Sequence, residues 1–184
     1  TVSIRPDQQL TRGNTRKEGK TKDLMIKGIN KFRWYAALVS LILISSCTGN
    51  VIFTDSVPIP AEKWNLNNVP TFSIPVDDTL SANDISLLIR TGSSYPFRNI
   101  YLFITTESPQ GLTLTDTIEY FLADEKGNWY GKGFGDIKEL TLPYKTNVFF
   151  PARGTYNIAI RHGMRTEDLK GVYDIGLRVT RTVK

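Results

Sequence analysis

The sequence predicts an all-β fold, a single antiparallel β-sandwich of about eight strands with jelly-roll connections. Apolar and polar residues alternate with a period of two over most of the chain from residue 72 onward, as they do in half-buried strands. Glycine, proline, asparagine and aspartate interrupt this alternation at short intervals, which is typical of tight turns. Helical periodicity is scarce in the same region. Residues 59–184 are therefore expected to form the sandwich domain.

The first 24 residues are polar and rich in lysine, arginine, threonine and glycine, without apolar periodicity. A segment of this composition buries too little apolar surface to fold alone. Met25 stands where an export signal would begin. Residues 1–24 are therefore predicted to be a disordered extension, or one that natural translation omits.

Residues 25–46 have the layout of a lipoprotein signal peptide. Three basic residues between positions 27 and 33 precede an apolar run from Trp34 to Ile44 that only Ser40 interrupts. A membrane-spanning helix needs about 20 apolar residues, and this run has only about half that length. The pattern favours a cleaved export signal over a permanent transmembrane helix.

The signal ends in Ile44-Ser45-Ser46-Cys47, an aliphatic residue and two small residues before the single cysteine of the sequence. This matches the bacterial lipobox, in which the peptide is cut before the cysteine and the thiol carries a diacylglycerol. Cys47 is thus predicted to be the lipid-attachment site, and residues 47–58 to form a lipid-anchored tether and the first strand. The alternative is an ordinary secreted protein whose cysteine lies near the cut by chance.

Two strands indicate their own place in the sheets. Residues 72–76 alternate apolar and polar, and Pro75 cannot donate a ladder hydrogen bond, so this strand is expected at a sheet edge. Residues 99–106 are apolar on both faces and are expected between two neighbouring strands. The other strands are predicted at 51–53, 85–90, 118–122, 137–142, 148–150, 156–160 and 173–179.

The charge of the chain is distributed unevenly, which bears on its partners. The chain has 23 basic and 18 acidic residues, but residues 1–46 contain nine of the basic and three of the acidic ones. From Cys47 onward 14 basic residues accompany 15 acidic ones, a formal charge of −1. Nucleic-acid binding would require a basic patch on the folded domain, so no nucleic-acid partner is expected.

Few residues suggest catalytic or metal-binding chemistry. His162 is the only histidine, so a Ser-His-Asp arrangement or a histidine metal site would rest on that one side chain. Its setting, Arg161-His162-Gly163 at the end of a predicted strand, favours a surface or turn location. The sequence therefore predicts no enzyme activity, no metal and no cofactor.

Two further patterns admit a functional and a structural interpretation. The glycine-rich stretch 131–136 resembles a phosphate loop, but the strand predicted after it favours an irregular crossover in which glycine supplies positive φ. The acidic pairs at 77–78 and 124–125 could bind calcium or act as acid and base. Adjacent side chains diverge on a strand or tight turn, so solvated turns are the favoured interpretation of both pairs.

Aromatic residues gather in or beside the predicted loops rather than at core positions. Rigid rings give binding surfaces contact area at low entropic cost, so these residues are candidates for a partner-binding surface. They could equally cap the ends of the sandwich, and both interpretations stay open. The partner-binding candidates are Tyr95, Phe97, Trp129, Tyr130 and Phe134.

Six blocks of sequence follow the lipobox in a specific order and spacing. They are YPFRN at 95–99, DTIEY at 116–120, GNWYGKGFGD at 127–136, FPARGTY at 150–156, HGMR at 162–165 and GVYDIG at 171–176. In this combination the chain resembles the GldH gliding-motility lipoproteins of Bacteroidetes, over residues 25–184.

The resemblance implies a non-catalytic cell-envelope lipoprotein associated with the gliding apparatus and with type IX protein secretion. It would be held to the membrane by the lipid on Cys47, and its partners would be other envelope proteins of that machinery. Surface-exported lipoproteins of this phylum commonly carry an acidic run after the cysteine, and residues 48–51 have none. The implied location is the outer membrane, facing the periplasm. The alternative is a lipid-anchored ligand- or glycan-binding β-sandwich module, an analogy from fold alone.

Overall fold

The structure is a computed structural model that describes residues 50–133 and 135–183. The chain divides into two units, Thr1–Thr48 and Gly49–Lys184, and the second contains every described residue. The predicted extension, the signal peptide, the lipid site at Cys47 and the ring of Phe134 lie outside the described residues and stay predictions. Within those residues, no helix is long and apolar enough to cross a membrane.

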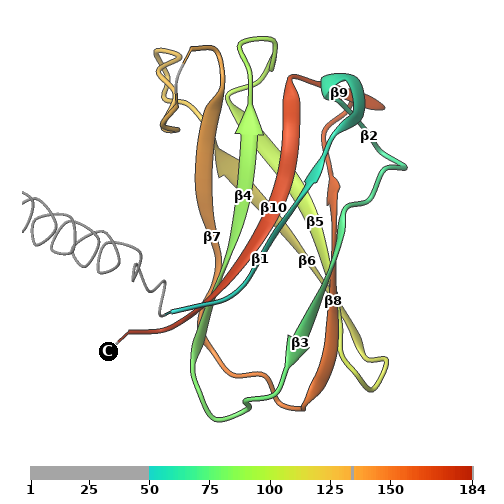
Figure 1. The fold of residues 1–184 in the computed structure, drawn as a ribbon. Coiled ribbons are helices and arrows are strands. Elements are labelled where there is room, and N and C mark those ends of the chain that lie inside the picture. The colour runs from blue at the N-terminus through green and yellow to red at the C-terminus, as the bar shows by residue number, and fades with distance from the viewer. Residues whose placement is uncertain (1–49, 134, 184) are drawn as a thin grey trace, which may run out of the picture. The chain divides into compact units, whose positions relative to one another are not determined.

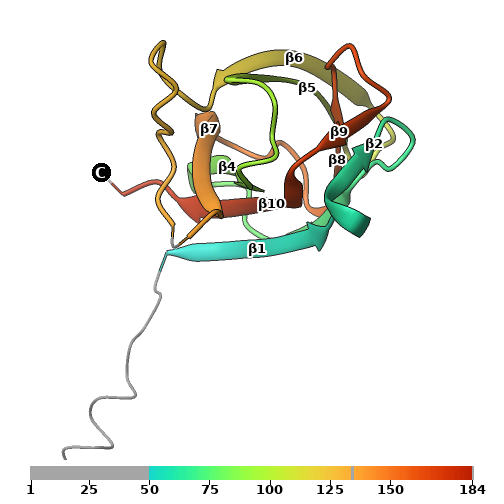
Figure 2. The same cartoon turned by 90° about the horizontal axis from the view of Figure 1, so that it is seen from above.

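Two four-stranded antiparallel sheets form the body of the domain (Figures 1 and 2). Sheet I has the strand order β1 (Val51–Pro58), β10 (Val172–Arg181), β4 (Asn83–Thr91), β7 (Lys138–Val148). Sheet II has the order β3 (Thr71–Val76), β8 (Gly154–His162), β5 (Asn99–Glu107), β6 (Thr113–Phe121). After the short 3-10 helix η1 (Pro60–Glu62), β2 (Lys63–Asn65) pairs with β9 (Asp168–Lys170) in a two-stranded ribbon. The predicted all-β sandwich is confirmed.

Two placements predicted from the sequence are also confirmed. β3, which contains Pro75, lies at an edge of sheet II, where one side of the strand needs no ladder partner. β5 lies between β8 and β6. Its two faces differ, however, because Ile100, Leu102 and Ile104 are buried whereas Tyr101 is 39% exposed. The outer face of sheet II is therefore a surface that carries aromatic residues.

The strand boundaries of sheet I differ from the prediction. β7 is one continuous strand, where the sequence predicted two, at 137–142 and 148–150. Pro143 lies inside it, which β7 tolerates as an edge strand. Irregular register opposite residues 83–86 and a positive φ of 53° at Asn147 break the alternation on which the prediction relied. The prediction of a separate strand at 148–150 is wrong.

The alternation pattern also failed to predict two short strands and a bulge. β2 and β9 have three residues each, too few to show a period of two. In β10 the register shifts between Val172 and Asp174, so Val172 is buried and Tyr173 is only half-buried, although the alternation predicted an inward Tyr173. Residues 50–133 and 135–183 accordingly form ten strands, eight of them in the two large sheets.

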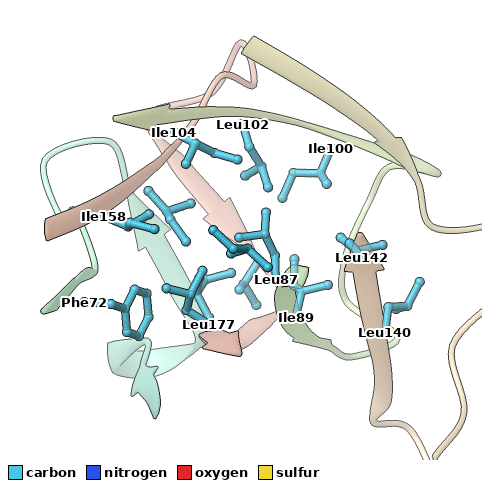
Figure 3. Packing of buried hydrophobic residues seen from close by; sticks show 14 of the residues in the cluster. Phe72, Leu87, Ile89, Ile100, Leu102, Ile104, Leu140, Leu142, Ile158 and Leu177 are labelled. Atoms are coloured by element: carbon cyan, nitrogen blue, oxygen red, sulfur yellow. The ribbon is translucent and has the colours of Figure 1, made fainter. Parts of the chain in front are cut away.

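The core fills the space between the two sheets (Figure 3). Ile100, Leu102 and Ile104 of β5 face Leu87 and Ile89 of β4 across this space, and all five are buried. Removal of apolar surface from water, at roughly 25 cal/mol per Å², favours the association of the sheets. Because side chains alternate along a strand, this inner layer also fixes which residues face outward.

Candidate functional site

Four of the five predicted partner-binding aromatics are described by the structure, and these four lie at one end of the sandwich, called the distal end below. It is formed by residues 92–98 between β4 and β5, residues 122–137 between β6 and β7, and the β2–β9 ribbon, at the top of Figure 1. The first loop contains Tyr95 and Phe97, and the second contains Trp129 and Tyr130.

Two of these aromatics lie in the core or pack against it. Tyr95 is 4% exposed, and its hydroxyl donates a hydrogen bond to the carbonyl oxygen of Asn99 at 2.8 Å. Its ring packs edge-on against Trp129, with 6.0 Å between the centroids, and Trp129 is itself half-buried against the core. Burial raises the pKa of the Tyr95 hydroxyl, so the group stays a neutral donor. Tyr95 and Trp129 therefore cap the sandwich, one of the two interpretations that the sequence left open.

Phe97 and Tyr130 are the predicted candidates that lie at the surface. Phe97 is 39% exposed, and its ring contacts Tyr95 edge-on with 6.1 Å between centroids. Tyr130 is more exposed still. The two do not share one site, because Phe97 lines a groove on sheet II whereas Tyr130 lines a separate hollow with Phe121 and Lys132.

The groove beside Phe97, called the aromatic groove below, opens on the outer face of sheet II and has a volume of about 680 Å³. Its lining is Phe97, Tyr101, Gly163, Met164 and Arg165. The Gly163 N–H donates to the Tyr101 carbonyl oxygen at 2.6 Å, and the Tyr101 N–H donates to the Met164 sulfur at 3.4 Å. These two hydrogen bonds hold the segment after β8 against β5. The groove therefore lies over backbone groups whose hydrogen bonds are already made.

Glycine and arginine fix the rings on this face of the sheet. A Cβ at Gly163 would lie 2.8 Å from the Phe103 ring, so glycine is required for that ring to lie where it does. The guanidinium carbon of Arg161 lies 5.2 Å from the Phe103 centroid, and that of Arg98 lies 5.8 Å from the Phe121 centroid. Both distances fit cation–π contacts. The surface therefore presents aromatic rings already paired with cations.

The aromatic groove combines an apolar floor with basic neighbours. Arg98, Arg161 and Arg165 are all exposed in or beside it. Glu119 lies opposite Tyr101 in the β5–β6 ladder, and a hydrogen bond with Glu119 raises the pKa of the Tyr101 hydroxyl. Tyr101 is consequently neutral at physiological pH and can act as donor and acceptor toward a ligand.

Sequence reasoning missed most residues of this surface. Tyr101 and Phe103 alternate with the buried positions of β5, and their apolar character led only to the expectation that this strand lies between two neighbouring strands. Phe121 and Met164 lie just where β6 and β8 end, where an alternation pattern no longer indicates direction. The alternation of side chains along residues 100–104 could have identified part of this surface, because it places Tyr101 and Phe103 together on one face of the strand.

His162 is not at the surface or in a turn, so that prediction is wrong. It is the last residue of β8, has no exposed surface, and continues the inward series of Tyr156, Ile158 and Ile160. Its ring packs edge-on against Trp64 with 5.2 Å between centroids, and within the described part of the chain neither ring nitrogen has a partner at hydrogen-bond geometry. Burial lowers the pKa of His162, an effect that nearby backbone groups of Trp64 and Glu167 partly offset.

The buried His162 should make folding stability depend on pH. Because its pKa is lower in the folded protein than in the unfolded chain, the unfolded chain binds more protons below about pH 6.5. Stability attributable to this residue is fully present above that pH and is lost as the pH falls, by at most about 1.4 kcal/mol per unit. Urea unfolding of wild type and His162→Leu between pH 8 and pH 5 measures this. Equal pH dependence in the two proteins would contradict it.

The remaining candidates serve local structure, as the favoured interpretations predicted. Asp78 accepts hydrogen bonds from the Leu80 N–H at 2.8 Å and the Ser81 hydroxyl at 2.6 Å, which closes its own turn. Asp124 likewise accepts from the backbone of the turn that follows it. A Cβ at Gly131 would lie 2.8 Å from Leu140 of β7, so the glycine-rich stretch is a close crossover before a strand. Among the described residues, no three His, Cys, Asp or Glu side chains gather as a metal site would need.

A family model and two related proteins identify the same family for this chain. The model of the GldH lipoprotein family matches residues 51–179. A gliding motility lipoprotein GldH from Flavobacterium johnsoniae is 35% identical over 149 residues, which cover 77% of this chain and 92% of that protein. A GldH homolog from Christiangramia forsetii is 30% identical over 158 residues, or 82% of this chain and 96% of that protein. A crystal structure of dimeric latent PorU from Porphyromonas gingivalis aligns with 74% of this chain and 13% of that one, at 13% identity, but its TM-score of 0.28 supports no inference.

Proposed function

Because this chain belongs to the GldH family of gliding-motility lipoproteins, we propose that it is a non-catalytic assembly or interaction component of the gliding and type IX secretion machinery. In this proposal the lipid on Cys47 anchors it to the outer membrane, and the sandwich faces the periplasm. Its partners are other envelope proteins of the same machinery.

The observation that carries this proposal is the aromatic groove. Tyrosine, phenylalanine, methionine and arginine are enriched at protein interfaces, and the groove combines all four in Tyr101, Phe97, Met164 and Arg165. Monomeric proteins rarely expose several apolar side chains side by side unless the patch binds something. A protein partner that covers the groove would bury these rings and pair with the arginines.

A glycan-binding function is the alternative, and the arginines weigh against it. A sugar ring binds by stacking on an open aromatic face. Arg161 already lies over the ring of Phe103, and Arg98 over that of Phe121, at cation–π distance. A glycan that stacked on either of these two rings would have to displace its guanidinium group, whereas a partner carboxylate could bind the guanidinium where it is.

We also assign the sandwich to the jelly-roll class, on the basis of its connections. Each sheet has four long strands. All consecutive links between those eight strands cross from one sheet to the other, except the hairpin between β5 and β6. This wrapping of paired strands around a two-sheet core is the arrangement that the class describes.

The function is tested by truncating the ring at the centre of the groove. Tyr101→Ala should weaken partner binding by about 2 kcal/mol or more, roughly 30-fold in affinity, as central interface aromatics typically do. Because Tyr101 is 39% exposed, the melting temperature should change little. The measurement is affinity capture of tagged lipoprotein from detergent-solubilised envelopes, with quantitative mass spectrometry of the co-purified proteins.

Leu114→Ala is the matched control, because Leu114 is an exposed apolar residue of β6 outside the groove. It should co-purify the same proteins as wild type. If Tyr101→Ala also retains the full set of partners, the groove is not the interaction surface. If Tyr101→Ala unfolds, the ring is structural and the proposal loses its main support.

A further inference from the structure

The end of the sandwich opposite the distal end, called the proximal end, contains both the start and the end of the folded domain. β1 starts there at Val51, and β10 ends there at Arg181, because Val51 pairs with Thr180 in their ladder. The loops at 77–82, 108–112 and 149–153 lie at the same end, since they join β3 to β4, β5 to β6 and β7 to β8. Figure 1 shows these connections together at the bottom of the domain.

The proximal end exposes apolar side chains on its loops, on β1 and on the segment after β10. Leu80 is 87% exposed, Leu112 is 74% exposed and Val183 is 73% exposed, the three highest values among the large apolar residues described. Phe149 and Ile52 are exposed at the same end. Each comes from a different segment, so the exposure is a property of the whole end. Such a surface on a monomer indicates contact with a partner or a membrane.

Two of these loops also suit an apolar environment, because several of their backbone groups are paired. Asp78 accepts hydrogen bonds from the N–H groups of Leu80 and Ser81, at 2.8 and 3.2 Å. Ser108 donates its N–H to the Leu112 carbonyl oxygen at 2.8 Å, and its hydroxyl oxygen accepts from the Leu112 N–H at 3.1 Å. Unpaired polar groups make entry into lipid costly, and these turns avoid that cost.

The length of chain between the lipid and the fold sets how close this end lies to the bilayer. Val51, the first residue of β1, is four residues beyond Cys47. At about 3.5 Å per residue, a fully extended link spans roughly 14 Å, about twice the thickness of the headgroup region of one leaflet. The proximal end therefore cannot move far from the lipid surface if Cys47 is acylated, which is part of the function proposed above.

We propose that the proximal end docks on the membrane, with Leu80, Leu112, Phe149 and Val183 in the lipid interface. The lipid then anchors the protein and these four side chains orient it, as paired membrane signals do for other lipidated proteins. The acidic side chains of Asp77 and Asp78 accompany Arg153 and Arg181 at this end, and Arg181 forms an ion pair with Asp78 at 3.1 Å. With no excess of positive charge among these residues, the contact is apolar and does not depend on anionic lipid or low salt.

The test uses single-cysteine labelling of the full-length lipoprotein, because acylation leaves Cys47 without a free thiol. Leu80→Cys and Leu112→Cys variants are labelled with an environment-sensitive dye and reconstituted into phosphatidylethanolamine vesicles, with and without phosphatidylglycerol. Tyr130→Cys at the distal end is the matched control, since Tyr130 is also highly exposed. The expected result is blue-shifted emission, quenched by lipids brominated in the acyl chain, at positions 80 and 112 but not at 130.

The possible outcomes separate this inference from the proposed function. Water-like emission at 80 and 112 in acylated protein would overturn the docking and leave the lipid anchor intact. A blue shift that grows with protein density and is not quenched by brominated lipid would show a second copy on this surface, which also overturns it. Dye attached to Cys47 in wild type would show that the anchor itself is absent, a failure of the proposed function.

Discussion

Leu102→Ala is expected to lower the free energy of unfolding by about 2 to 5 kcal/mol, the usual range for truncating a buried leucine. Leu102 is 2% exposed and lies in the middle of β5, paired with Ile118 of β6 on one side and with His162 of β8 on the other. Both neighbouring strands fix the backbone, so the surrounding side chains can only partly fill the space that the lost isobutyl group leaves. Chemical unfolding monitored by circular dichroism measures the loss.

Leu112→Ala is the matched control for this substitution, because it removes the same atoms from a side chain that is 74% exposed. It should change the unfolding free energy by no more than about 0.5 kcal/mol. A loss of less than about 1 kcal/mol for Leu102→Ala would mean that β5 does not pack against sheet I as Figure 3 shows.

Cys47→Ser is expected to abolish acylation completely. Lipid transfer at a lipobox forms a thioether to the cysteine sulfur, and serine has no sulfur to receive it. The variant should accumulate as uncleaved precursor or move to the soluble fraction, while the sandwich stays folded because Cys47 precedes the first strand. Intact-mass spectrometry and membrane flotation of the two proteins measure the change.

Ser46→Ala is the matched control, since it keeps a small residue immediately before the cysteine. It should be processed and float with membranes as wild type does. An unmodified thiol at Cys47 in the wild-type protein would contradict the prediction and leave the ordinary secreted protein as the interpretation.

The large strands that bury one face were predictable from their alternation. The alternation in β3 and β8 was enough to predict two half-buried strands, and Pro75 was enough to predict that β3 lies at an edge. Where the backbone departs from ideal pairing, the alternation fails, as at Tyr173 beside the bulge in β10 and at Asn147 in β7. Bulges and positive φ at a residue other than glycine leave no regular mark in a sequence.

The candidate site was only partly predictable, for a different reason. Composition identified aromatics in loops, but it could not separate Tyr95, which hydrogen-bonds inside the core, from Phe97 two residues later, which lines the groove. The direction in which a side chain of an irregular loop points depends on its contacts with residues that are distant in the sequence. The location of His162, by contrast, was predictable. Tyr156, Ile158 and Ile160 alternate along β8, and the next residue on the same face is His162, which this alternation places in the core.

The pairing of β1 determines how the domain would bear mechanical load. β1 has one ladder partner, β10, and the chain enters it at Val51 from the proximal end. Hydrogen bonds in an antiparallel ladder lie perpendicular to the strands. A pull between the lipid and a partner on the distal end therefore acts along β1 and strains all of its ladder bonds at once. Such a force would shear β1 along β10 rather than break their hydrogen bonds one after another. Tension would therefore have to break all the bonds of this ladder together before β1 could separate from the domain.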